Sequence, residues 1–477
     1  MVTFLISLVA LLLGFFIYGK IVDNFFKPTD NTTPAVAKND GVDFVPLPTW
    51  KVFLIQLLNI AGLGPIFGAI GGAIWGTSVY IWIVCGTIFA GGVHDYLSGM
   101  ISLREGGKSL SEIIGKYLGD NALKIMHVFL VLLLVLLSAV FAVGPAGLLK
   151  MMTGIDATIL LLAILAYYFL ATLLPIDTII GRLYPIFGIC FIAMALGIMG
   201  GMFLNESASM PEMQLANLHP KGDAMPIWPL MFITVACGAI SGFHATQSPL
   251  MSRCLKSERL ARPVFYGAMI SEGVIALIWA AAAITFFHGT DALAAEMNAN
   301  GAGAVVYKIT GGFLGEGVGM ILAMIGVVVC PITSGDTALR SARLILSDWF
   351  NMPQDKIKNR LTFAMPLIIL TGIITQLDFN SVWRYFAWVN QSIATIMLWT
   401  GAVYMIQKLD GKKFLAAMIP ATFMTIVTTT YIFYAPEGLQ LPLTISNTVG
   451  LICAGICLIK FWRTFNQTEN AMRLHTH

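Results

Sequence analysis

The chain carries repeated apolar runs of about 20 residues, the length that a helix needs to cross the roughly 30 Å hydrocarbon core of a bilayer. Only 11% of its 477 residues are charged, while 57% are hydrophobic. A transmembrane β-barrel would instead show short segments of alternating polarity. The runs therefore predict an all-α, polytopic membrane protein, and a net charge of +3 is too small to favour nucleic acid as a partner.

We count thirteen candidate spans, near 2–22, 50–75, 78–102, 123–144, 157–176, 183–204, 226–251, 264–289, 316–346, 361–376, 381–407, 413–434 and 441–463. The first lacks a basic segment before it and a clear cleavage site, so we expect it to be retained. With the N-terminus outside, the external loops hold only four of the 28 Lys and Arg residues: Lys150, Lys221, Lys308 and Arg384. Because cytoplasmic loops are normally rich in these residues, we predict an external N-terminus and a cytoplasmic C-terminus.

The second span contains NIAGLGPIFGAIGGAIWG, residues 59–76. Gly62, Gly64 and Pro65 are expected to interrupt the helix. Interrupted helices at membrane depth are tolerated where the freed backbone lines a cavity or is buried in protein. A second interpretation is a small-residue face for close helix packing, because glycine recurs at every fourth residue from 64 to 76.

The seventh span contains CGAISGFHATQSP, residues 237–249. Ser241, His244 and Ser248 share one face if the helix continues through Gly242. A histidine in the hydrocarbon usually faces a bundle interior or a wet cavity, and its ordinary pKa near neutrality makes a proton role possible. The alternative is a neutral histidine satisfied by a serine or a backbone carbonyl.

The two interrupted spans are five spans apart and enter the membrane from opposite sides. This arrangement predicts a five-plus-five inverted repeat with the binding site between the breaks. Within a single transporter domain, 50–204 would form the first repeat and 226–407 the second, with additional helices at 1–49 and 413–477. The predicted substrate-binding residues are Asn59, Gly62, Gly64, Ser241, Gly242, His244, Gln247, Ser248 and Asn390.

Three further spans carry polar residues. In CPITSGDTALRSARL (330–344), Thr333, Ser334 and Asp336 suit Na⁺ or a carried proton, although Asp336 could instead pair with Arg340 one turn later. In GGVHDYLSG (91–99), the adjacent His94 and Asp95 are expected to point to different sides; they either take part in ion coupling or mark the cytoplasmic end of the span. Asn390 could also serve interhelical hydrogen bonding, and Glu272 is a lone carboxylate with structural and functional interpretations equally open.

Neither a cofactor nor a metal site is expected. Most of the seven cysteines lie in apolar runs, where a thiol usually packs as a small hydrophobe. Cys453 and Cys457 share a helix face but have no histidine or acidic residue nearby. No GxxxxGK[ST], HExxH or GxSxG motif occurs, so direct ATP drive, an intramembrane protease and an esterase are not favoured.

Four stretches resemble the CstA family of carbon starvation proteins: DGVDFVPLPTW (40–50), NIAGLGPIFGAIGG (59–72), AGGVHDYLSGMISLREGGKSLSEIIGKYLG (90–119) and CGAISGFHATQSP. The chain resembles a short form of that family. The resemblance implies a bacterial inner-membrane uptake carrier for peptides or pyruvate, with proton coupling, used in starvation. It also implies the fold of the amino acid–polyamine–organocation superfamily, in which Thr333 and Ser334 would supply hydroxyls to a cation site opposite carbonyls near Ile60 and Leu63.

The leading hypothesis is a secondary symporter for a small carboxylate or a short peptide. The alternative is a nutrient sensor on a transporter scaffold, which binds solute without net flux; a membrane enzyme and a channel are less favoured. Pyruvate and a dipeptide both carry a carboxylate, so the sequence does not distinguish between them as substrates. His244 favours H⁺ as the coupling ion, whereas Thr333 and Ser334 allow Na⁺. The sequence gives no indication of the oligomeric state.

Overall fold

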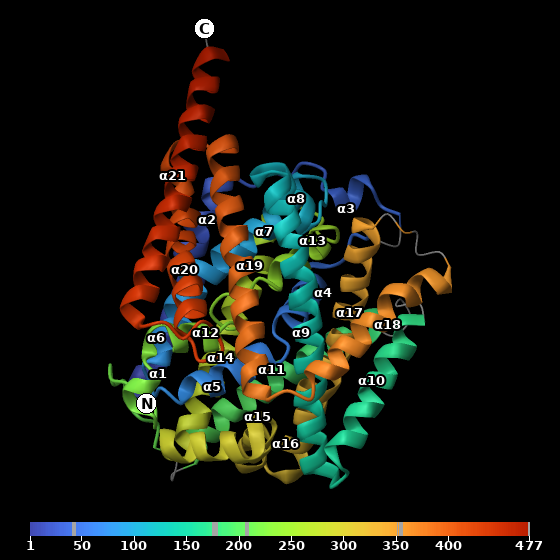
Figure 1. The fold of residues 1–477 in the computed structure, drawn as a ribbon, viewed down its shortest axis with the longest axis vertical. Coiled ribbons are helices and arrows are strands. Elements are labelled where there is room, and N and C mark those ends of the chain that lie inside the picture. Colours follow the sequence, from blue (N-terminus) through green and yellow to red (C-terminus); the bar gives the residue numbers. More distant parts are fainter. Residues whose placement is uncertain (41–43, 174–179, 206–208, 351, 353–355, 476–477) are drawn as a thin grey trace.

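The computed structural model describes residues 1–40, 44–173, 180–205, 209–350, 352 and 356–475. Within these ranges the chain is built from helices, without a β-strand. The two termini lie at opposite ends of the bundle, and α21 (Leu443–His475) extends beyond the other helices at the C-terminal end (Figure 1). The prediction of an all-α fold is confirmed.

Eight helical segments of the described chain are long and apolar enough to cross a membrane, or nine if one bent pair counts as a span. The eight are Val2–Phe26, Asp120–Thr153, Ile186–Leu204, Glu258–Phe286, Glu316–Ser347, Ile357–Ile374, Gly411–Tyr434 and Leu443–Asn470. The polar helices of the predicted third, seventh and eleventh spans are not among them, so the number thirteen is not confirmed. The predicted end of the fifth span, 174–176, falls outside the described residues.

The bent pair is the second span, interrupted as predicted. Its first half, α4, covers Thr49–Ile60 and ends four residues before Gly64. The chain resumes with a π-helical turn at Gly64–Gly68 and continues into α5 (Ala69–Ala73). The two halves are bent by 53°. The position of the bend follows from Pro65, which has no amide hydrogen to donate.

The seventh span is also broken, and here one expectation was wrong. The short helix α12 ends at Thr234, and α13 begins only at His244 and runs to Ser252. Between them the backbone is not helical, and Gly238 has a φ of +88°. The helix therefore does not continue through Gly242, and Ser241 lies in the irregular segment rather than on a shared helical face. We call residues 235–243 the seventh-span break.

The other helices surround these two interrupted spans. Their bounds are α1 Val2–Phe16, α2 Tyr18–Phe26, α3 Pro34–Ala37, α6 Val79–Cys85, α7 Gly92–Arg104, α8 Leu110–Leu118, α9 Asp120–Thr153, α10 Ala157–Leu173, α11 Ile180–Leu204, α14 Gly267–Phe286, α15 Thr290–Leu314, α16 Glu316–Ala323, α17 Cys330–Trp349, α18 Ile357–Ile374, α19 Phe379–Lys408 and α20 Leu415–Tyr434. A π-helical turn at Gly86–Gly91 joins α6 to α7. The most extensive packing pairs are α9 with α17 and α20 with α21.

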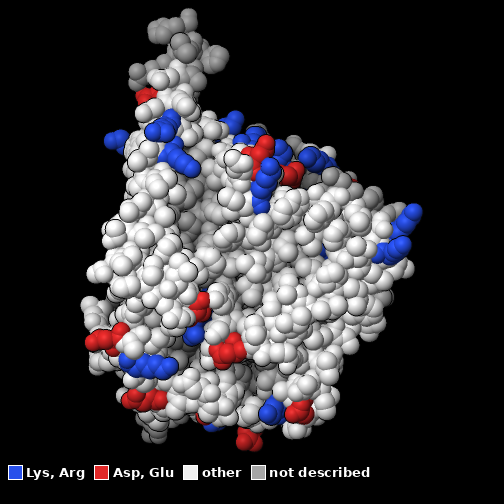
Figure 2. Space-filling model, in the orientation of Figure 1, with Lys and Arg blue, Asp and Glu red and all other residues white. Residues whose placement is uncertain are grey.

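Loops assigned to the same side of the membrane contact one another. The α-amino group of Met1 bonds Glu212 at 2.8 Å, which joins the N-terminus to the predicted external loop 205–225. At the other end, Arg104 Nη2 bonds Glu258 Oε2 at 3.0 Å, so two predicted cytoplasmic loops meet. Figure 2 shows Lys and Arg gathered at the end of the molecule that bears the C-terminus. These contacts and the distribution of basic residues agree with the sides of the membrane to which the loops were assigned.

Candidate functional site

The small-residue face of the second span packs against the interrupted backbone of the seventh span. A Cβ atom added at Gly64 would lie 2.1 Å from Cys237 Cβ, and one added at Gly72 would lie 2.3 Å from Val235 Cγ2. These distances are far below van der Waals contact, so the two glycines allow the spans to approach closely. Both interpretations of the second span, an interrupted helix and a small-residue face for close packing, therefore apply.

Asn390 of α19 holds the seventh-span break in place. Its Oδ1 accepts a hydrogen bond from the Phe243 amide at 2.7 Å, and its Nδ2 donates to Ser241 Oγ at 2.9 Å. Its backbone oxygen accepts from the Gly242 amide at 3.0 Å. Backbone groups that leave a helix inside a membrane must find partners within the protein. Asn390 meets that need, and this is the interhelical role that the sequence had left open beside substrate binding.

His244 stands between two buried carboxylates at the first residue of α13. Its Nδ1 lies 3.0 Å from Asp95 Oδ2, and its Nε2 lies 3.4 Å from Glu272 Oε2. The second oxygen of Asp95 is 2.8 Å from His94 Nδ1. All four side chains are inaccessible to solvent. We call these four residues the His244 cluster; they come from α7, α13 and α14.

The placement of His94 and Asp95 corrects the expectation that they point to different sides. Adjacent positions on a helix are rotated by about 100°, yet both side chains turn into one site because the imidazole of His94 reaches the neighbouring carboxylate. Neither residue marks the end of its span. α7 continues from Gly92 to Arg104, and the helix between them is buried through Leu103.

The charge of the His244 cluster depends on how many protons it carries. With both imidazoles neutral and both carboxylates ionised, Asp95 and Glu272 would carry two negative charges in a region that water does not reach. Burying a charge without a partner is costly, because the low-dielectric interior does not replace the lost hydration. With one added proton, His244 Nδ1 lies at hydrogen-bonding distance from Asp95, the cation faces Glu272 at 3.4 Å, and one negative charge remains when both carboxylates are ionised. The geometry therefore suits the binding of a proton or of another small cation.

Cys237 lies next to the His244 cluster. Its sulfur and one ligand-type atom each of His244 and Glu272 fall within 4.8 Å of one another. Such spacing would admit a small cation, and the expectation that the chain binds no metal stays a prediction.

Two further hydrogen bonds brace the seventh span and were not anticipated. Gln56 of α4 donates through Nε2 to Ser248 Oγ at 3.1 Å. Thr87 donates through Oγ1 to the carbonyl oxygen of Gly238 at 2.8 Å. Gly238 lies in the break and Ser248 lies in α13 beyond it, so the third span holds the irregular backbone and the second span holds the helix that follows.

The other residues predicted in these two spans have local roles in this structure. Gln247 is partly buried and bonds the neighbouring hydroxyl of Thr246 at 2.9 Å. Gly62 faces the ring of Phe141, which would lie 2.8 Å from an added Cβ atom. Asn59 is partly buried near the end of α4. Their participation in substrate binding stays a prediction.

The ninth-span residues do not join the His244 cluster in this structure. Thr333 donates its hydroxyl to a carbonyl of its own helix at 2.8 Å, and Ser334 is buried beside it. Asp336 accepts from the Tyr167 hydroxyl at 3.0 Å and lies 3.7 Å from Arg340. The predicted pairing of Asp336 with Arg340 is thus observed, while a cation site at Thr333 and Ser334 stays a prediction.

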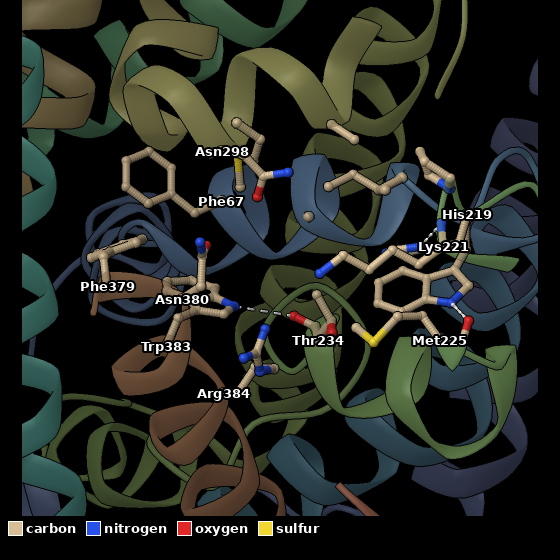
Figure 3. Close-up of a pocket in the computed structure, with 16 residues that line it drawn as sticks. Phe67, His219, Lys221, Met225, Thr234, Asn298, Phe379, Asn380, Trp383 and Arg384 are labelled. Carbon is tan, nitrogen blue, oxygen red and sulfur yellow. Dashed lines mark hydrogen bonds between the residues drawn. The ribbon is translucent and has the colours of Figure 1, made fainter. Parts of the chain in front are cut away.

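A cavity lies on the side of the seventh-span break that the sequence predicts to be external (Figure 3). Its volume is about 130 Å³. We call it the vestibule. It is lined by Phe67, Gly71, Ile74, Trp75, His219, Pro220, Lys221, Met225, Thr234, Ala294, Met297, Asn298, Phe379, Asn380, Trp383 and Arg384. Its inner wall includes Thr234, the last residue of α12, which directly precedes the break.

The predicted external loop, of which residues 209–225 are described, forms one wall of the vestibule. The indole of Trp75 donates to the Met225 carbonyl at 2.9 Å, and its ring lies 4.7 Å from the ring of His219. His219 Nδ1 accepts from the Lys221 amide at 3.1 Å. Partial burial, with the nearby Lys221 charge, lowers the pKa of His219 from 6.5 to about 4.

Because of this shift, we expect acid to loosen the loop. An exposed histidine binds a proton below pH 6.5, whereas the folded loop resists protonation down to about pH 4. The open loop therefore binds more protons across that window, and the closed loop loses stability as the pH falls. The protection factor of the amides in residues 217–223, measured by hydrogen exchange and corrected for the intrinsic rate, should rise from pH 5 to pH 7.5. His219→Phe keeps an aromatic ring without the titration, and an unchanged pH dependence in that variant would contradict the assignment.

The sequence did not single out the vestibule or the partners of His244. Glu272 was visible as a lone carboxylate in a span, but no spacing rule connects it to a histidine in another span. Lys221 and Arg384 were visible as two of the four external basic residues. That rarity was the available signal, and only the fold shows that the two share one cavity.

Comparisons with known proteins give one consistent result. The sequence profile of the family described as "Carbon starvation protein CstA" matches residues 1–153, 144–302 and 288–431. Together these matches cover most of the chain. The resemblance noted in the sequence is therefore confirmed.

Three curated relatives are similar to the chain. An "Uncharacterized membrane protein" of Haemophilus influenzae is 40% identical, over 61% of this chain and 93% of that protein. The "Peptide transporter CstA" of Bacillus subtilis is 27% identical over 85% of both proteins. The "Pyruvate/proton symporter BtsT" of Escherichia coli is 27% identical over 52% of this chain and 43% of its own length. Among solved structures, a manganese transporter of Eremococcus coleocola aligns with a TM-score of 0.49 and 14% identity, covering 91% of this chain and 99% of that one.

Proposed function

The chain belongs to the CstA family of membrane transporters, and on that premise we propose that it is a proton-coupled uptake carrier for a small carboxylate such as pyruvate. Its relatives include a peptide transporter and a pyruvate/proton symporter. Both names describe a transport protein rather than an enzyme. The proton, the solute and their sites are the parts that we add.

The observation that carries the proposal is the position of His244 between Asp95 and Glu272. An ionisable group inside a membrane is costly unless it has a function or a partner. Here the partners are two buried carboxylates beside an irregular segment of backbone. A proton taken up at this point alters the charge of the cluster next to the seventh-span break, which supplies a physical link between proton binding and helix movement.

The size of the vestibule favours a small solute. Sites for drug-sized ligands typically measure about 300–1,000 Å³, whereas this cavity measures about 130 Å³. A three-carbon acid is a closer match to this volume than a peptide. The cavity lies on the external side of the break, so it is suited to a solute that arrives from outside.

We place the carrier in the bacterial inner membrane with its N-terminus outside and its C-terminus in the cytoplasm. The support is the concentration of Lys and Arg at the C-terminal end of the molecule (Figure 2), which matches the usual enrichment of cytoplasmic loops. This orientation puts the vestibule on the external face, as uptake requires.

Uptake into proteoliposomes tests the function. We expect labelled pyruvate to accumulate under an inward proton gradient, by up to about tenfold per pH unit if one proton accompanies each solute. A protonophore should abolish the accumulation, and a Na⁺ gradient alone should not support it. A labelled dipeptide measured in parallel tests the peptide alternative. Saturable binding without accumulation under any gradient would contradict transport and favour a nutrient sensor.

A further inference from the structure

We propose that the vestibule is an external binding site for a monocarboxylate, whose carboxylate is held by Lys221 and Arg384. This inference rests on the proposed function for its substrate class, and it adds the place and the residues. It also separates the two solutes named among the relatives, because the site favours an anion over a zwitterionic peptide.

The charge of the vestibule is the first observation. Of the four Lys and Arg residues predicted outside, two line this one cavity. No Asp or Glu is among the lining residues. A cleft lined by charge of one sign concentrates ligands of the opposite sign and raises their rate of association. The cavity is therefore electrostatically suited to a small anion that approaches from outside.

Lys221 is available to bind such an anion. Its ammonium group makes no hydrogen bond or ion pair shorter than 4.0 Å with any described residue. Its side chain extends from the loop into the cavity, which Arg384 and Thr234 also line (Figure 3). By contrast, the external Lys308 bonds Glu296 Oε2 at 2.6 Å. Two cations that line one small cavity repel each other, and a bound carboxylate relieves that repulsion.

Arg384 has donors to spare. Its Nε donates to Glu437 Oε1 at 2.9 Å, which fixes the direction of the side chain. A guanidinium has five N–H donors, and the terminal pair matches the two oxygens of a carboxylate. Arg384 is thus positioned by Glu437 while its other donors face the cavity (Figure 3).

The walls of the vestibule discriminate between solutes. Aromatic rings of Phe67, Trp75, Phe379 and Trp383 provide apolar contact, and the amides of Asn298 and Asn380 can bond a carbonyl oxygen. A 2-oxo acid combines a carboxylate, a carbonyl oxygen and an apolar group in a small volume. A dipeptide brings an α-ammonium group as well, and the lining offers no carboxylate to receive it, so a buried positive charge would lie beside Lys221.

The vestibule also leads toward the His244 cluster. Trp383 Nε1 bonds the carbonyl oxygen of Thr234 at 3.4 Å, and the chain enters the seventh-span break at the next residue. An anion held at Lys221 therefore lies at the external mouth of the interrupted segment. Movement of that segment can connect the two places.

Binding of labelled pyruvate to purified protein in nanodiscs, measured by scintillation proximity, tests the site. We expect saturable binding that unlabelled pyruvate displaces and that neutral pyruvamide or dialanine displaces poorly. Lys221→Gln should weaken binding by about fivefold or more, which is the effect of about 1 kcal/mol. Lys221→Arg should restore most of it. Lys150→Gln removes another external charge that lies outside the cavity, and it should leave the affinity unchanged.

Each outcome has a distinct meaning. Equal affinity in the wild type and Lys221→Gln, or equal displacement by pyruvate and pyruvamide, would overturn this inference. If Lys221→Gln weakens binding but the wild type never accumulates pyruvate under a gradient, the vestibule site stands and the proposed transport fails. If uptake is proton-driven with the same KM in both proteins, transport stands and the vestibule site fails.

Discussion

In proteoliposomes with an inward proton gradient, His244→Gln should lose the accumulation of pyruvate and retain exchange. Glutamine keeps a hydrogen-bonding group near Asp95 but cannot carry the proton. We therefore expect the accumulation ratio to fall from about tenfold per pH unit to one. Exchange of external labelled pyruvate for internal pyruvate needs no net proton movement and should continue. The measurement compares both modes in the same vesicles.

The choice of substitution matters, because the His244 cluster is buried. His244→Ala leaves Asp95 and Glu272 without their shared partner, and breaking a buried pair in this way costs about 3–5 kcal/mol. Loss of uptake in that variant could reflect a loss of folded protein. His288→Gln changes an exposed histidine outside the cluster and should behave as the wild type.

Two results would contradict the role of His244. Gradient-driven accumulation that survives in His244→Gln would remove this residue from proton coupling. A stoichiometric metal ion in the purified wild-type protein, lost in His244→Gln, would instead assign the cluster and Cys237 to a cation. The ratio of accumulation to exchange separates either case from simple misfolding, because a misfolded carrier loses both.

The interrupted spans could be predicted because their causes are local. Pro65 and the glycines around it weaken one helix, and the polar run from Gly238 to Pro249 weakens the other. The membrane class followed in the same way from apolar length. The number of spans was less secure, because the spans that carry Asp95 and Asn390 were counted from the sequence, whereas their helices in the structure do not meet the combined requirement of length and apolar character.

The site could be predicted only in part, because it is assembled from distant segments. His244 was recognisable as an expensive residue in an apolar run, but its partners lie in two other spans. Helical spacing placed His94 and Asp95 on different sides, whereas side-chain reach brings them together at 2.8 Å. Glu272 had no neighbour in sequence that indicated its partner. Such contacts depend on how helices pack, which periodicity does not encode.

Gly242→Ala should lower the yield of folded protein. An added Cβ would lie 2.3 Å from the carbonyl oxygen of Asn390 and 2.7 Å from the amide nitrogen of Ala394. Both neighbours are backbone atoms of α19, so neither can turn aside. Overpacking typically costs about 1–3 kcal/mol. Here it would also displace the Phe243 amide, whose hydrogen bond the side chain of Asn390 accepts.

The matched control is Gly147→Ala in α9, where no atom lies within 4 Å of an added Cβ. Alanine favours a helix by up to about 1 kcal/mol over glycine, so this variant should be as stable as the wild type or more so. The thermal midpoint of monodisperse protein in detergent compares the two. Equal midpoints would show that the seventh-span break can move away from α19 at little cost. The break would then be held by its own backbone rather than by Asn390.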